Sequence, residues 1–77
     1  MDHDHVMEAV HAGRLAEAVV TPAEGADGWV LMLLGGGGEP LPYTTGGGMP
    51  KVFHTLDRAT EIARELGFES IRVEERF

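Results

Sequence analysis

The histidines near the amino terminus are the residues of this chain whose types and spacing best suit a metal ion. Met1-Asp2-His3 can present the terminal amine, two deprotonated amides and an imidazole in one plane, which suits Cu(II) or Ni(II). Any free chain with histidine at its third position offers these groups. His5 and His11 fall at no helical spacing that would add ligands. We therefore interpret the motif as adventitious and expect no functional metal site.

No pairing of a nucleophile with a base is evident elsewhere in the sequence. The chain contains no cysteine, so it has no disulfide framework, thiolate metal site or cysteine nucleophile. The glycines at 35–38 are followed by an acid and a proline, whereas a phosphate-binding loop leads directly into a helix. Asp57, Glu61 and Glu65 share a helical ridge that we expect to face solvent. The sequence therefore predicts a protein that is not an enzyme, with no catalytic residue and no cofactor.

Length and charge narrow the class of protein further. Seventy-seven residues make one domain, 1–77, near the size at which a single core is only just sufficient and a partner subunit often completes the fold. The net charge of −7 argues against binding to phosphate backbones over the whole surface. The apolar runs are too short to span a bilayer, and the acidic amino terminus does not resemble a signal peptide. We expect a cytoplasmic protein, and an oligomer.

The basic residues are concentrated in the last third of the chain. Arg14 is the sole basic residue of 1–50, and the other five lie beyond it: Lys51, Arg58, Arg64, Arg72 and Arg76. Six acids are interleaved with these five, a pattern typical of a solvated surface with local ion pairs. A nucleic-acid-binding accessory factor that uses these five residues is the alternative function.

The first half of the chain is expected to form a short helix and three strands. The helix runs over Asp4–Ala12, is capped by Asp2 or Asp4, and is expected to leave residues 1–14 mobile unless it docks. The predicted strands are Leu15–Thr21, Trp29–Leu34 and Leu41–Thr45. Asp27-Gly28 predicts an antiparallel hairpin between the first two, and the prolines predict that the third is an edge strand. The glycines at 35–38 and 46–48 are read as loops.

The second half of the chain is expected to add a strand, the main helix and a final strand. Lys51–His54 is the short strand, and Thr55 caps a helix that Gly67 closes. The apolar face of this helix consists of Leu56, Ala59, Ile62, Ala63 and Leu66. The segment Glu69–Glu74 alternates between polar and apolar residues and predicts the final strand.

Together these elements predict a small α+β fold of order α-β-β-β-(β)-α-β. The three- to four-stranded, mainly antiparallel sheet carries the C-terminal helix on one face. The expected core consists of Trp29, Leu34, Phe53, Ile62 and Leu66. Both faces of Trp29–Leu34 are apolar, so the second face needs a cover, either the N-terminal helix or a second subunit.

This need for a cover predicts a non-enzymatic interaction module that pairs with itself as a homodimer or with a partner protein. The pairing is expected to use the apolar sheet face and the unpaired edge near Leu41–Thr45. The predicted contact residues are Leu31, Leu33, Leu41 and Tyr43.

Several runs of the sequence resemble those of a family of small plasmid-partition-associated accessory proteins, found on plasmids and integrating elements. The runs are Gly28-Trp29-Val30, Pro50-Lys51-Val52-Phe53-His54-Thr55-Leu56-Asp57-Arg58-Ala59, Leu66-Gly67 and Ile71-Arg72-Val73. The resemblance implies an accessory role in the maintenance of a mobile element. It carries over no catalytic residue.

Overall fold

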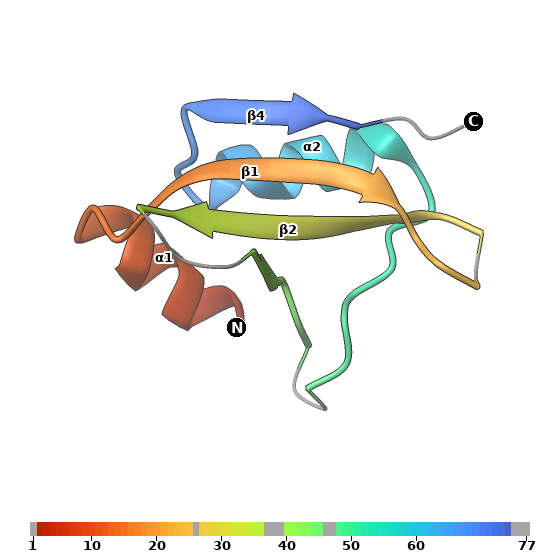
Figure 1. Cartoon of the computed structure of the whole chain (residues 1–77), viewed down its shortest axis with the longest axis horizontal. Helices are drawn as coiled ribbons and strands as arrows, with labels where there is room; N and C mark the ends of the chain where they lie inside the picture. The colour runs from red at the N-terminus through yellow and green to blue at the C-terminus, as the bar shows by residue number, and fades with distance from the viewer. Residues whose placement is uncertain (1, 26, 37–39, 46–47, 75–77) are drawn as a thin grey trace.

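A computed structural model describes residues 2–25, 27–36, 40–45 and 48–74 of the chain. Its elements are, in order, α1 (His3–His11), β1 (Leu15–Pro22), β2 (Trp29–Gly35), β3 (Leu41–Pro42), α2 (Leu56–Glu65) and β4 (Ser70–Val73) (Figure 1). This arrangement confirms the predicted α+β class, with an N-terminal helix, a sheet and a later helix. Neither helix in the described ranges is long and apolar enough to cross a membrane.

The four strands form one mixed sheet in the order β3-β2-β1-β4. β1 and β2 are antiparallel, with Val19 opposite Met32 and Val20 opposite Leu31. β3 is antiparallel to β2, whereas β4 is parallel to β1. The hairpin turn requires a glycine at position 28, where φ is +141° and a Cβ atom would lie 2.5 Å from the Phe53 carbonyl oxygen. The predicted hairpin is therefore present.

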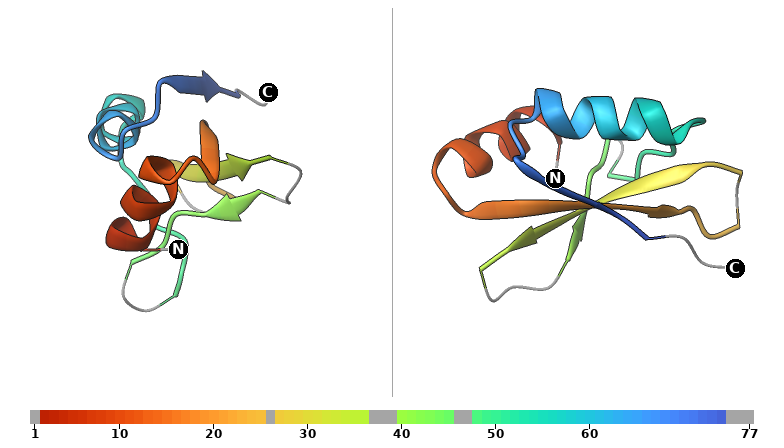
Figure 2. Two further views of the ribbon diagram at one scale, coloured as in Figure 1. Left: turned by 90° about the vertical axis from the view of Figure 1, so that its left-hand side faces the viewer. Right: turned by 90° about the horizontal axis from the view of Figure 1, so that it is seen from above.

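Both helices lie on the same face of the sheet, which Figure 2 shows in the view from above. α1 packs on β1, and α2 packs on β1 and β2. Their inward side chains form one core with the sheet, to which the helices contribute Val6, Ala9, Ala59, Ile62, Ala63 and Leu66. The N-terminal helix therefore docks on the same face of the sheet as α2. It does not cover the second face of β2, for which it was one of the two covers considered.

Side chains cap both helices at their amino ends. The Asp2 carboxylate accepts the His5 backbone N–H at 3.0 Å and lies 2.7 Å from Nδ1 of the same residue. These bonds, the backbone one above all, hold the pKa of Asp2 below its ordinary 3.8. At α2, the Thr55 hydroxyl accepts the Arg58 backbone N–H at 3.1 Å, which confirms the predicted cap.

The predicted orientation of the central strand was wrong in part. Leu31 and Leu33, expected as interface contacts, are fully buried in the core beneath the helices. Leu34, expected in the core, points to the other face, and Trp29 packs half-buried against the core. The other expected core residues, Phe53, Ile62 and Leu66, are buried.

The segments on either side of the second glycine loop are less regular than predicted. Within Leu41–Thr45, the strand is limited to β3. The expected strand at Lys51–His54 is an isolated bridge, in which Phe53 and Trp29 exchange backbone bonds of 2.7 and 2.8 Å. Parts of the predicted loops 35–38 and 46–48 lie outside the described residues.

Candidate functional site

The face of the sheet opposite the helices carries a row of apolar side chains, which we call the open face. It consists of Val19 on β1 and Val30, Met32 and Leu34 on β2. The three β2 residues are half-buried and none belongs to the core cluster. Val19 is buried because Met32 and the β4 residue Arg72 flank it on the neighbouring strands. A sheet whose second face is apolar normally packs against another layer.

Charged side chains border the open face on the β4 side. The Arg72 guanidinium lies 3.5 Å from a carboxylate oxygen of Glu17 and 3.5 Å from one of Glu74. Ser70 donates its hydroxyl to Glu17 at 3.3 Å. Two carboxylates thus share one guanidinium within a single copy, and exposed pairs of this kind contribute little to stability.

A groove lies along the opposite border of the open face. Its volume is about 550 Å³, and its lining includes Val30 and Met32 of β2, the segment 49–52 except Lys51, and the residues 21–24 at the end of β1, among them Glu24. Met49 is 70% exposed, the largest exposed fraction among the exposed large apolar side chains of the described residues. The apolar surface therefore extends beyond the sheet onto this segment.

The predicted contact residues fall in different environments. Leu31 and Leu33 belong to the core, and Leu41 on the edge strand is 44% exposed. Tyr43 is 9% exposed and stacks on Phe53 with 6.1 Å between ring centroids. Leu41 alone among these four presents a large part of its side chain to a partner. Sequence reasoning missed the neighbouring set of Val30, Met32 and Leu34.

The basic residues of the alternative function are dispersed. Lys51 and Arg58 line one pocket, and Arg64 lies exposed in the last turn of α2. Arg72 belongs to the border of the open face, and Arg76 lies outside the described residues. The structure thus brings two of the five into one pocket. Nucleic-acid binding stays a prediction.

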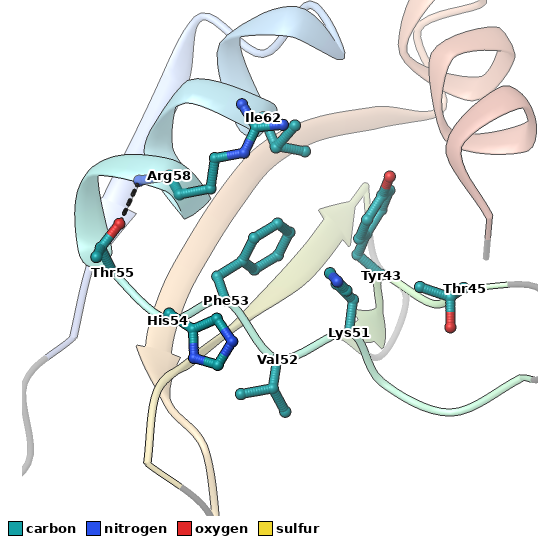
Figure 3. A pocket seen from close by; sticks show the side chains of 9 residues that line it. All are labelled: Tyr43, Thr45, Lys51, Val52, Phe53, His54, Thr55, Arg58 and Ile62. Atoms are coloured by element: carbon teal, nitrogen blue, oxygen red, sulfur yellow. Dashed lines mark hydrogen bonds between the residues drawn. The ribbon is translucent and has the colours of Figure 1, made fainter.

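The pocket that Lys51 and Arg58 line lies between α2 and the segment that leads into it (Figure 3). Its volume is about 480 Å³. Figure 3 shows the Phe53 ring reaching into the space between α2 and Tyr43, with the side chains of Lys51 and Arg58 on its two sides. The remaining lining residues are Thr45, Val52, His54, Thr55 and Ile62.

The histidines of the amino terminus are engaged in hydrogen bonds. Nδ1 of His3 lies 3.0 Å from the Tyr43 hydroxyl, and His5 contacts Asp2. The described part of the chain contains no group of three or more histidine or acidic side chains placed to hold a metal ion. The Cu(II) or Ni(II) motif, interpreted above as adventitious, includes Met1, which lies outside the described residues.

Tyr43 makes the docking of α1 sensitive to alkaline pH. Burial raises the pKa of Tyr43 above its ordinary 10.0, and the carboxylates of Asp2, Glu65 and Asp4 raise it further. Because the folded-state pKa is the higher one, the contribution of the protonated Tyr43 to stability is complete below pH 10 and is lost as pH rises through the folded pKa. We expect the free energy of unfolding, measured in urea, to fall as pH rises from 10 to the folded pKa. Tyr43→Phe should remove that part of the slope, and an unchanged slope would contradict the assignment.

Comparisons of the chain with protein-family models, curated proteins and solved structures gave no match. The arguments about function therefore rest on the residues and their geometry.

Proposed function

We propose that this chain is a non-enzymatic protein-interaction module that pairs with a second copy of itself through the open face. The observation that carries the proposal is the placement of both helices on one face of the sheet. Val30, Met32 and Leu34 thus remain half-exposed on the other face. Removing them from water on association is favourable in proportion to the apolar area buried.

The charges of the open face favour a second copy as the occupant. Its apolar part consists of Val19, Val30, Met32 and Leu34, and beside it Glu17, Arg72 and Glu74 pair with one another within one chain. Two copies of an apolar patch can pack on each other across a two-fold axis, which is how most homodimers form.

The size of the face sets the strength of the expected dimer. The four strands contain 8, 7, 2 and 4 residues, which at about 3.3 Å per residue and about 4.8 Å between strands give a face of roughly 330 Å² in plane. Standard interfaces bury about 800 Å² per partner, and this face is well below that size, in the class of weak or transient contacts. We therefore expect a dissociation constant of about 10–100 µM, so that the monomer dominates at a few micromolar chain.

Sedimentation velocity over a range of concentrations tests the proposal. Between about 5 µM and 1 mM we expect the mass to rise from that of the 8.3 kDa monomer to that of a dimer. Added salt should strengthen the association, because it screens the repulsion between two chains of charge −7. A monomer at every concentration, or an open series of larger oligomers, would contradict an isologous pair.

The proposal includes a cytoplasmic location, which suits a chain without cysteine. It also includes an accessory role in maintaining a plasmid or other mobile element. That role rests on the sequence resemblance alone.

A further inference from the structure

We propose that the pocket between α2 and the segment 51–55 binds a small organic anion, an apolar or aromatic body that carries one phosphate or carboxylate group. Val30, Met32 and Leu34 of the open face do not line this pocket, which shares Val52 with the groove beside that face. The inference rests on the shape of the pocket and on the residue types that line it.

The first argument is charge segregation. The chain has thirteen acidic and six basic residues, yet the described residues that line this pocket include Lys51 and Arg58 and no acid. Glu61, one helical turn beyond Arg58, lies 3.0 Å from the Arg58 guanidinium. Such exposed pairs contribute little, so an entering anion can compete for Arg58. The pocket thus brings together two of the six basic side chains of an acidic chain.

The second argument is the apolar part of the lining. Phe53 and Ile62 are buried at its base, and the Tyr43 ring stacks on Phe53. Inorganic phosphate would leave these apolar side chains without a contact, whereas a ring attached to the phosphate or carboxylate group would cover them. The volume of about 480 Å³ falls within the usual range for small-molecule sites, roughly 300–1,000 Å³.

The third argument concerns which groups remain able to bind. The Tyr43 hydroxyl contacts Nδ1 of His3, and the first-turn N–H of Arg58 is donated to Thr55. The other polar side chains of the lining include Thr45 and His54, and we assign the acid to Lys51 and Arg58 because lysine and arginine carry a full positive charge at neutral pH. Arginine forms a planar fork for phosphate or carboxylate, and lysine adds a flexible point charge.

The test is a titration followed by backbone amide chemical shifts, with phenyl phosphate and 3-phenylpropionate as the two probes. We expect at least one probe to give saturable shifts at Phe53 and in the first turn of α2, with a dissociation constant of about 1 mM. The comparison of the two probes identifies the preferred acid. Phenol and inorganic phosphate, each lacking one half of the recognised chemistry, should bind at least about tenfold more weakly.

Variants of the basic residues complete the test. Lys51→Gln and Arg58→Gln should each weaken binding about tenfold, and Arg64→Gln, on the same helix but outside the lining, should leave it unchanged. All three positions are exposed, so the variants should retain the native spectrum. The proposal is overturned by an absence of saturable shifts, by phenol binding as well as the anions, or by equal losses in all three variants. Val30, Met32 and Leu34 do not line this pocket, so these results can be interpreted whether or not the chain dimerises.

Discussion

Leu31→Ala is expected to lower the free energy of unfolding by about 2–5 kcal/mol, because it leaves a cavity in a core position that is fully buried. Leu34→Ala on the same strand should lower the free energy of unfolding of the monomer by clearly less, since Leu34 is half-exposed on the open face. Urea denaturation at a few micromolar chain, where we expect the monomer to dominate, measures both values. The pair therefore reports directly on which face of β2 is covered by the helices.

The opposite ranking would contradict the orientation of β2. A domain of this size has little stability to spare, so Leu31→Ala could fail to fold. Leu31→Val and Leu34→Val then give the same comparison with a smaller deletion. Equal losses at the two positions would also contradict the structure, because they would require the same burial on both faces.

Met32→Asp is expected to abolish dimerisation while the monomer stays folded. A charge at the centre of the open face would be desolvated in the dimer and would meet its own copy across the two-fold axis. We expect the dissociation constant to rise by more than about a hundredfold, which removes the dimer from the accessible concentration range. Sedimentation velocity at the highest soluble concentration measures the change.

Met7→Asp is the matched control for this variant. Met7 is 43% exposed on α1, on the other side of the sheet, and receives the same substitution. It should leave the association unchanged. Met32→Thr introduces a β-branched residue, which favours a strand, so the fold should be retained. The dimer should still be weaker, because the threonine side chain is smaller and more polar than that of methionine. Loss of association in Met7→Asp, or a normal dimer in Met32→Asp, would exclude the open face as the interface.

The amino-acid sequence predicts the elements of this fold well because local signals mark their ends. Thr55 caps α2 as expected, Gly67 follows its end with φ of +99°, and Asp27-Gly28 marks the hairpin. The final strand also forms where Ile71 alternates with polar neighbours. These signals involve residues close together in the chain, so they can be read without knowledge of the tertiary structure.

The two faces of β2 could not be assigned from sequence for a physical reason. Trp29–Leu34 is apolar throughout, so it lacks the period-two alternation that tells the inner face from the outer. The register with β1 decides the matter, because it pairs Val20 with Leu31 on the helix side and Val19 with Met32 on the other. That register is a tertiary property. The error in the predicted contact residues follows from it.

The pocket between α2 and Tyr43 shows a similar limit. Lys51 and Arg58 were recognised as basic residues, but their common lining of one pocket depends on the bridge between Trp29 and Phe53. This bridge joins residues 24 positions apart in the chain. Their spacing in the sequence places these two cations near each other, but it does not indicate that buried apolar side chains, Phe53 and Ile62, lie between them in the pocket.

The most direct test of the central claim, that a second copy covers the open face, is a search for contacts between subunits. Equal amounts of ¹³C-labelled and unlabelled chain are mixed at a concentration where the dimer dominates, and nuclear Overhauser effects between the two populations are recorded. The account predicts contacts from the methyl groups of Val30, Met32 and Leu34 to the same residues of the other copy. Contacts between subunits that arise instead from Met7 or Leu41, with none from these three, would contradict it.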